Sequence, residues 1–231
     1  MQPPGTPSYV EIARAETERG ELVLRERRGE DDGPAALELR ANGVFVMDTV
    51  EVSTERALAA AALALVEDPR AVVVGGLGLG FTMHEVLADS RVELCSVVEI
   101  EQSLVDWMRD GTIAHGPAYL ADARVNVVVT DVAMAVAEAR PASYDLVLLD
   151  VDNGPGHLVH ESNAALYAEP FLRAVRGVLR PGGAAVIWSA APAPELEAAM
   201  TTVFDATEAR PLDVRIQGRS EQYWLYVGRT P

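Results

Sequence analysis

Three glycines and an acidic residue have the spacing of a nucleotide-binding turn. An apolar run at residues 71–74 is followed by Gly76, Gly78 and Gly80, and Glu99 comes nineteen residues after the last of these glycines. This pattern is typical of a buried strand that turns sharply into a helix beneath a nucleotide. Glycines there let the backbone approach a ligand and expose N–H groups at the helix start. The sequence therefore predicts a site for an adenosine-containing cofactor.

The spacing of the glycines disfavours a nicotinamide cofactor. Gly76, Gly78 and Gly80 form G-x-G-x-G, whereas the dinucleotide fingerprint G-x-G-x-x-G requires a glycine where this chain has Phe81. On its own the motif also fits a plain tight turn between a strand and a helix. The acidic residues that follow the next strands therefore carry the prediction.

Three acidic residues stand where successive predicted strands end. Glu99 is placed to accept hydrogen bonds from ribose hydroxyls, Asp131 to hold an adenine amino group, and Asp150 ends the strand after them. Each of them alone also fits a helix N-cap or a solvated loop acid. Ligands of open α/β sheets bind beyond the carboxyl ends of the strands, so we expect the glycines and these acids to form one site.

The elements that position these residues are expected to alternate between strands and helices after Pro69. We predict strands near residues 71–75, 92–98, 124–130, 144–150 and 182–188, and helices near residues 80–88, 101–110, 132–140, 162–178 and 193–204. Runs as apolar as Val127 to Val129 belong inside a sheet that is covered on both faces. Pro181-Gly182-Gly183 is expected to close the long helix, and residues 212–216 and 223–227 to form a final antiparallel pair.

The residues before this alternating region predict a small β appendage. Short strand-like patterns at residues 21–27, 36–40 and 44–48 surround Asn42-Gly43, a dipeptide typical of two-residue hairpin turns. Ser53 is expected to cap a helix that runs to about residue 66. Residues 1–8 predict a loose tail.

We therefore expect two units in an α/β fold. Residues 1–66 would hold the tail, the hairpin appendage and the linking helix, and residues 67–231 the cofactor-binding catalytic domain. The exposed edges of the hairpin make a homodimer plausible, because unpaired strand edges are commonly covered by a partner.

Composition limits the partners of this chain. Of its 231 residues 35 are acidic and 19 basic, which gives a net charge of −16 and no broad positive field for a phosphate backbone. We therefore expect no nucleic-acid partner. No stretch approaches the roughly 18 apolar residues of a spanning helix, and the first residues lack an apolar leader segment, so we expect a cytoplasmic protein without membrane association.

No metal site is predicted. Cys95 is the only cysteine, so there is neither a disulfide framework nor a cysteine metal site. His157 and His160 lack a nearby acid cluster at ligand spacing, and we expect them to line the cleft of an acceptor substrate. Trp188, Tyr223 and Trp224 lie in strand patterns and are expected to be core or interface aromatics.

The order of these motifs resembles the class I S-adenosylmethionine-dependent methyltransferases, and within them the spermidine synthase-like branch. The resemblance runs from about Leu37 to the C-terminus and is carried by residues 72–80, 97–101, 130–131, 144–150 and 179–183. It implies a Rossmann-like, mostly parallel sheet of seven strands that ends in an antiparallel pair and is preceded by a small β domain.

The resemblance also implies roles for individual residues. Gly76, Gly78 and Gly80 would line the cofactor, Glu99 would bind its ribose, Ile100 would pack on adenine, and Asp131 with Val132 would contact the adenine edge. Asp150 matches the acid that holds and deprotonates the attacking amine. Just beyond it, Asp152, Asn153 and His157 are further candidates for contacting the acceptor.

This chain departs from the branch at several positions. Leu79 stands where the Gly-Gly-Gly-Asp-Gly-Gly loop has its aspartate, and Asn153 replaces the second acid of the Asp-Ser-Ser-Asp-Pro motif. Val46 replaces a glutamine, Ser53-Thr54 a tyrosine-glutamine pair, and Ala59 and Ala61 a histidine and a proline. The lost groups recognise a diamine and the aminopropyl arm in that branch, so a polyamine synthase is disfavoured.

Leu79 also bears on the choice of cofactor. Decarboxylated S-adenosylmethionine ends in a cationic amine that favours a nearby aspartate, whereas the carboxylate of ordinary S-adenosylmethionine is repelled by one. We therefore expect ordinary S-adenosylmethionine and transfer of its methyl group to a small-molecule or peptide nucleophile. Two alternatives stay open: an aminopropyltransferase that uses decarboxylated S-adenosylmethionine and a non-standard amine, and a non-catalytic nucleoside-binding module.

Overall fold

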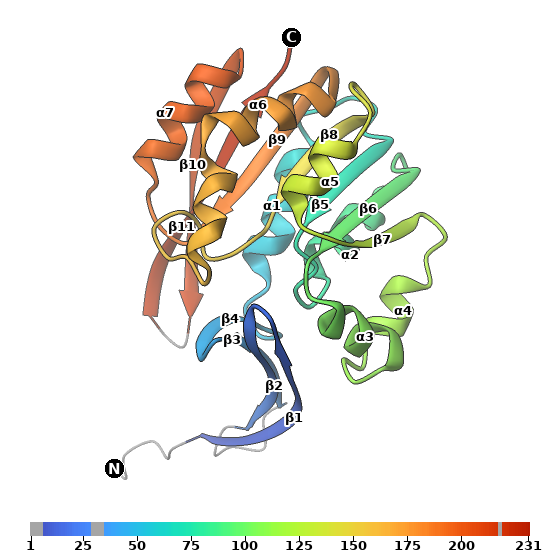
Figure 1. The fold of residues 1–231 in the computed structure, drawn as a ribbon, viewed down its shortest axis with the longest axis vertical. Helices are drawn as coiled ribbons and strands as arrows, with labels where there is room; N and C mark the ends of the chain where they lie inside the picture. Colours follow the sequence, from blue (N-terminus) through green and yellow to red (C-terminus); the bar gives the residue numbers. More distant parts are fainter. Residues whose placement is uncertain (1–6, 29–34, 217–218) are drawn as a thin grey trace.

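The computed structural model describes residues 7–28, 35–216 and 219–231, which fold into two sheets, the larger of them flanked by helices (Figure 1). The first sheet is antiparallel, with the order β1-β2-β3-β4. Its strands are β1 (Ser8–Thr17), β2 (Gly20–Arg28), β3 (Ala36–Ala41) and β4 (Val44–Asp48). The Asn42-Gly43 hairpin is confirmed: both residues have positive φ, 52° and 74°, as the predicted turn requires.

The second sheet has seven strands in the order β10-β11-β9-β8-β5-β6-β7. They are β5 (Ala71–Gly75), β6 (Leu94–Glu99), β7 (Val125–Val129), β8 (Tyr144–Leu149), β9 (Leu179–Ser189), β10 (Ala206–Ile216) and β11 (Arg219–Arg229). Strands β5 to β9 are parallel, and β11 pairs antiparallel with β9 and β10. The expected α/β fold, with its final antiparallel pair and separate N-terminal sheet, is confirmed.

Helices cover both faces of the large sheet (Figure 1). They are α1 (Ser53–Leu63), α2 (Phe81–Ala88), α3 (Gln102–Asp110), α4 (Gly116–Leu120), α5 (Val132–Glu138), the 3-10 helix η1 (Glu161–Tyr167), α6 (Glu169–Val178) and α7 (Pro194–Val203). One core joins α1, α2 and α3 to one sheet face, and a second joins α5, α6 and α7 to the other. Burial on both faces explains why all five residues of β5 are buried and uncharged.

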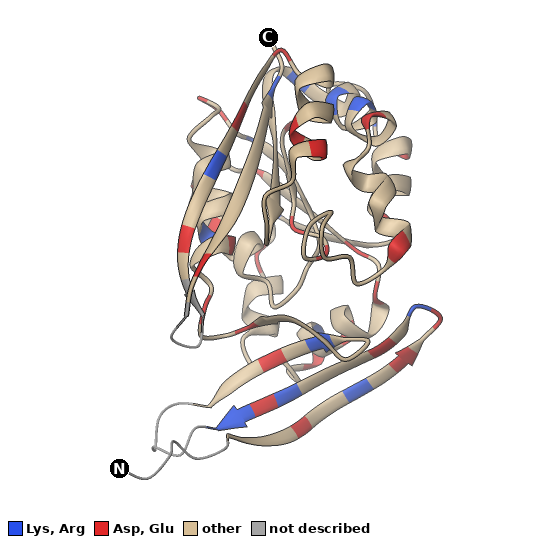
Figure 2. Cartoon of the chain, turned by 90° about the vertical axis from the view of Figure 1, so that its left-hand side faces the viewer, with Lys and Arg blue, Asp and Glu red and all other residues tan. Residues whose placement is uncertain are grey.

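The small sheet packs its apolar face onto the first core. Leu22, Leu24 and Leu39 are buried with Leu58 of α1 and with Leu79 after β5. The strands also carry arginines and acids in alternation along their length (Figure 2). Helix α1, which we expected to belong to the first unit, packs against α2 of the second. The boundary between the two units near residue 66 therefore stays a prediction.

The structure differs from several of the predicted elements. Strand β1 was not predicted, because its charged edge pattern hides the apolar alternation, and residues 1–6 of the predicted tail lie outside the described residues. The helix over residues 162–178 is divided between η1 and α6 at Ala168, just before Pro170. Pro181-Gly182-Gly183 lies in the irregular first part of β9 and does not follow the helix as a loop.

The start of α1 also differs from the prediction. Its N-cap residue is Val52, without a side-chain cap, and the helix ends at Leu63. Ser53 is the first helical residue, and its N–H donates to Oε1 of Glu51 over 3.0 Å. A glutamate two residues earlier thus takes the role that we predicted for Ser53. No helix in the described ranges is long and apolar enough to cross a membrane.

Candidate active site

A cavity of about 220 Å³ lies where the small sheet meets the carboxyl ends of the large sheet. The chain moves from β5 to one side for β6 and β7 and to the other for β8 and β9, so the cavity lies at a topological switch point. Gly75 pairs with Val98 of β6 and Leu149 of β8. The residues that follow, Gly76, Glu99 and Asp150, therefore meet at one level and line the cavity.

The glycine loop is tightly fitted between its neighbours. Gly76 has a φ of +93°, and a Cβ atom on it would lie 2.2 Å from the carbonyl oxygen of Asp150. Gly78 has a φ of +50°, and its Cβ would lie 2.7 Å from the sulfur of Met47. Gly80 is the N-cap residue of α2, with a φ of +86°, and is absent from the cavity lining that the described residues form. Two of the three predicted glycines thus lie at the cavity.

Leu79 faces the hydrophobic core. Its side chain is fully buried there and does not line the cavity in the part of the chain that the structure describes. Its N–H donates to the sulfur of Met47 over 3.2 Å, and its carbonyl accepts from Nε2 of His115 over 2.7 Å. An apolar side chain therefore replaces the carboxylate at this point of the loop.

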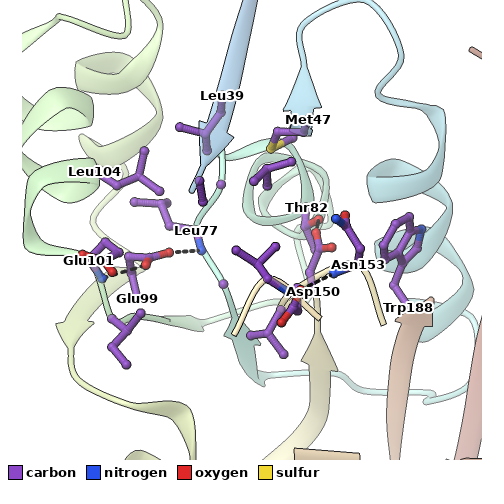
Figure 3. A pocket seen from close by; sticks show the side chains of 18 of the residues that line it. Leu39, Met47, Leu77, Thr82, Glu99, Glu101, Leu104, Asp150, Asn153 and Trp188 are labelled. Carbon is purple, nitrogen blue, oxygen red and sulfur yellow. Dashed lines mark hydrogen bonds between the residues drawn. The ribbon is translucent and has the colours of Figure 1, made fainter. Parts of the chain in front are cut away.

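Glu99 joins the glycine loop to the end of β6 (Figure 3). Its side chain is buried, and its two oxygens accept from the N–H groups of Leu77 over 2.9 Å and Glu101 over 2.8 Å. Burial raises the pKa of this carboxyl, and these backbone hydrogen bonds oppose the rise. Each oxygen keeps a further lone pair, which suits a pair of ribose hydroxyls.

The sequence predicts that Glu99 binds the ribose of the cofactor, so we expect Glu99→Gln to weaken S-adenosylmethionine binding about tenfold and to lower the thermal unfolding midpoint. An amide has one accepting oxygen, so either the Leu77 or the Glu101 N–H would face an NH₂ group. Calorimetric titration and thermal unfolding would measure both effects. Glu101→Gln is the matched control, because the Glu101 carboxylate accepts no hydrogen bond from a backbone N–H in the described structure, and its Oε1 lies 3.5 Å from Nε of Arg19. Equal losses in the two variants would contradict the prediction.

The residues that the sequence predicts to contact adenine combine polar and apolar groups. Asp131 is the N-cap of α5, and its Oδ1 accepts from the N–H of Ala133 over 2.7 Å. The helix-cap alternative therefore holds for Asp131, which also lines the cavity. Ile100, Val132 and Leu104 also line the cavity, and Leu104 lies on the same side as Glu99 and Glu101 (Figure 3).

Asp150 lies on the other side of the cavity, with Thr82, Asn153 and Trp188 (Figure 3). The Thr82 hydroxyl donates to its Oδ2 over 2.6 Å, and the Asp150 N–H donates to the Gly75 carbonyl over 2.8 Å. Burial raises the pKa of the Asp150 carboxyl, which the Thr82 hydrogen bond partly offsets.

Of the residues predicted to contact the acceptor, Asp152, Asn153 and His160 line the cavity, whereas His157 does not line it among the described residues. Asp152 has a φ of +62°, and its carboxylate accepts from the N–H of Val159 over 2.6 Å and from Nδ2 of Asn163 over 2.8 Å, so it organises its own loop at the cavity edge. Asn153 lines the cavity and reaches the Phe45 carbonyl over 3.4 Å. His157 is exposed and lies outside the lining found among the described residues, whereas His160 is part of it.

Sequence reasoning missed Glu55 as a site residue. It lies in the first turn of α1 and lines the cavity. Burial, followed by the neighbouring Asp150 charge, raises its pKa to about 7. The available signal was a glutamate at position 55, four residues after Glu51, on a helix whose other faces are mostly alanine and leucine.

Trp188 and Tyr223 were expected to be core or interface aromatics, and both line the cavity. Their rings pack edge to face, with an interplanar angle of 82° and centroids 4.9 Å apart. Burial and nearby acids, including Glu55, raise the pKa of Tyr223 to about 12. These two side chains form an aromatic wall of the cavity, beside Glu55.

The cavity is strongly acidic. Its lining includes eight acidic residues: Asp48, Glu51, Glu55, Glu99, Glu101, Asp131, Asp150 and Asp152. Among the described lining residues Arg19 is the one arginine, and its Nε lies 3.5 Å from Glu101. Such a cavity favours cationic ligands, including sulfonium and ammonium groups.

Solved structures with the same fold include spermidine synthases. One, determined with the transition-state analogue AdoDATO, superposes with a TM-score of 0.81 at 17% identity and covers 96% of this chain and 74% of its own. The spermidine synthase of Thermotoga maritima has a TM-score of 0.77 at 18% identity, covering 96% of this chain and 73% of its own. At these identities the likeness shows the fold.

Curated relatives match about half of this chain. Putrescine N-methyltransferase 3 of Nicotiana tabacum is 33% identical over 121 residues, which are 52% of this chain and 30% of that protein. Polyamine aminopropyltransferase 2 of Hyperthermus butylicus is 36% identical over 129 residues, which are 54% of this chain and 39% of that protein. The matched region thus spans only about a third of these relatives.

The family follows from the longest sequence match. Residues 51–210 match the family model for the spermine/spermidine synthase domain, and this range includes the glycine loop, Glu99, Asp131 and Asp150. The names of the relatives describe methyl and aminopropyl transferases, so the family is one of transferases. This chain belongs to the spermine/spermidine synthase family.

Proposed function

We propose that this protein transfers the methyl group of S-adenosylmethionine to an amine nitrogen of a small cationic acceptor. The observation that carries the proposal is the position of Asp150 between two different ends of one cavity. Towards the glycine loop lie Gly76 and Glu99, and towards α1 lie carboxylates with the aromatic wall of Trp188 and Tyr223. A sulfonium and an amine would meet beside Asp150.

The residues at the first end suit the cofactor chemically. Glu99 has lone pairs for a ribose diol, Ile100 and Val132 offer apolar contact for adenine, and the acidic lining favours a sulfonium. Bound S-adenosylmethionine would supply an electrophilic methyl carbon.

The residues at the second end would hold the acceptor and accept its proton. An alkyl ammonium has a pKa near ~10.4, so removing its proton at neutral pH costs roughly 4 to 5 kcal/mol. Asp150 would orient the amine for in-line attack and favour loss of the proton. The hydrogen bond from Thr82 fixes the carboxyl plane of Asp150 for this role.

Leu79 supports methyl over aminopropyl transfer. The glycine loop has no carboxylate at this position that could repel the methionine carboxylate or bind an aminopropyl ammonium, and the Leu79 side chain itself packs in the core. One observation favours the second candidate, aminopropyl transfer from decarboxylated S-adenosylmethionine. Arg19 is the one arginine among the described lining residues, and it already pairs with Glu101. The cavity therefore offers no unpaired arginine to a methionine carboxylate, which the decarboxylated cofactor lacks.

The mass of the product distinguishes the two reactions. With S-adenosylmethionine and putrescine we expect a product heavier by about 14 Da, whereas aminopropyl transfer from the decarboxylated cofactor adds about 57 Da. Mass spectrometry of parallel reactions, with a panel of mono- and diamines as acceptors, would measure this. Cofactor binding without any product across the panel would contradict both transfers and favour a nucleoside-binding module.

A further inference from the structure

Two carboxyl groups from different elements face the acceptor end of the cavity without a cation between them. Glu55 comes from α1 and Asp150 from the end of β8, and both line the cavity. Each is held by a buried threonine: Thr54 donates to Oε2 of Glu55 over 2.8 Å, and Thr82 to Oδ2 of Asp150 over 2.6 Å. Among the described residues no arginine lies within ion-pair distance of either carboxyl.

The other acidic groups that face Glu55 already have partners. Asp48 of β4 accepts from the N–H of Val50 over 2.8 Å and pairs with Arg27 over 3.0 Å. Glu51, which precedes α1, accepts from the N–H and hydroxyl of Ser53. Glu55 and Asp150 are therefore the pair at this end that is left for a substrate.

The remaining groups near Glu55 do not neutralise this pair. From β11, Tyr223 faces Glu55, and its pKa near 12 keeps the phenol protonated and neutral at physiological pH. Arg19 is part of the same lining but pairs with Glu101. Two like charges in a partly buried site raise each other's proton affinity.

Building on the proposed function, we infer that the proton of the attacking ammonium passes to the Glu55–Asp150 carboxyl pair, which makes Glu55 a second catalytic carboxyl. The N–H bond of the ammonium breaks and its proton goes to the dianionic pair. The freed nitrogen lone pair forms the new N–C bond, the C–S bond breaks, and its electrons stay on sulfur as a neutral thioether. The pair then releases the proton to water.

A pair serves this step better than one aspartate. An ordinary aspartate has a pKa of ~3.9, about six units below that of an alkyl ammonium. Burial and the Asp150 charge raise the pKa of Glu55 to about 7, which narrows this gap. Proton transfer is most effective when the acceptor pKa lies near the working pH.

The test compares Glu55→Gln, Glu55→Asp and the wild type over about pH 5 to 9, with S-adenosylmethionine and putrescine. We expect kcat/KM of the wild type to rise through an inflection near pH 7, where the pair loses its shared proton. Glu55→Gln should lower kcat about 10- to 30-fold and move the inflection to lower pH. Glu55→Asp keeps a carboxyl group, so its kcat and the pH of its inflection should lie between those of the wild type and Glu55→Gln. Glu195→Gln, an exposed control on α7, should match the wild type. An unchanged inflection in Glu55→Gln would overturn the inference.

The pH dependence of stability tests the pair without any turnover. A carboxyl whose pKa is raised in the folded state favours folding at low pH, and this contribution disappears as the pH rises from about 4.5 to about 7. The unfolding midpoint of the wild type should fall over this window, and less steeply in Glu55→Gln. Glu99 and Asp150 have raised pKa values in both proteins, so the difference between the two curves reports Glu55 and its interaction with Asp150. If the unfolding midpoints of the wild type and Glu55→Gln change in parallel with pH, the inference of a carboxyl pair is wrong. If they diverge but no amine reacts, the carboxyl pair is supported and the proposed function has failed.

Discussion

Asp150→Asn is expected to lower kcat by about 10²- to 10⁴-fold while S-adenosylmethionine binds within a few-fold of the wild-type affinity. Asparagine has nearly the shape of aspartate, and its oxygen can still accept from the Thr82 hydroxyl, which lies 2.6 Å from Oδ2 in the wild type. What the variant loses is the charge that holds an ammonium and favours loss of its proton. Methyl transfer to putrescine and calorimetric titration of the cofactor would measure the two effects separately.

The controls for Asp150→Asn separate catalysis from folding. Asp106→Asn, on the exposed face of α3, removes a carboxylate far from this chemistry and should leave both readouts unchanged. Unchanged turnover in Asp150→Asn would favour a binding module, and loss of both turnover and cofactor affinity would assign Asp150 to the architecture. A variant that also carries Glu55→Gln should lose less activity than the product of the two single effects, because groups that act as a unit are not additive.

The first half of the site was predictable from the sequence because parallel strands impose it. Once residues 71–75, 92–98 and 144–150 are read as neighbouring parallel strands, Gly76, Glu99 and Asp150 must meet at one edge of the sheet. The register confirms this, since Gly75 pairs with both Val98 and Leu149. Local periodicity and strand order were sufficient for this part.

The second half depends on tertiary packing that no local pattern encodes. Glu55 comes from a helix whose sequence reads as an ordinary amphipathic segment, and Trp188 and Tyr223 come from two strands that pair antiparallel across the sheet. Whether a strand aromatic faces the core or a cavity depends on what covers the sheet edge, and here the small sheet leaves that space open. The same limit applies to His157, which is exposed and lies outside the lining found among the described residues.

The glycine loop gives the second large effect: Gly76→Ala should destabilise the fold by about 3 kcal/mol or more and abolish cofactor binding. Its φ of +93° already disfavours any side chain, and the added Cβ would lie 2.2 Å from the Asp150 carbonyl oxygen. That oxygen belongs to the backbone at the end of β8, so relieving the clash must displace Asp150 itself. Thermal unfolding should show a midpoint lower by roughly 6 to 12 °C.

Gly182→Ala separates the clash from the backbone strain. Gly182 has a φ of +77°, and a Cβ atom there would meet nothing within 4 Å, so the variant should show only the left-handed penalty of about 1 to 2 kcal/mol. Its cofactor affinity should equal that of the wild type, because Gly182 lies outside the described cavity lining. Equal destabilisation in the two variants would mean that the loop after β5 can shift to relieve the clash at little cost in free energy. A larger loss of stability in Gly76→Ala, together with lost cofactor binding, would mean that the close contact between Gly76 and the Asp150 backbone is required. This contact lies where the proposed cofactor and acceptor ends of the cavity meet.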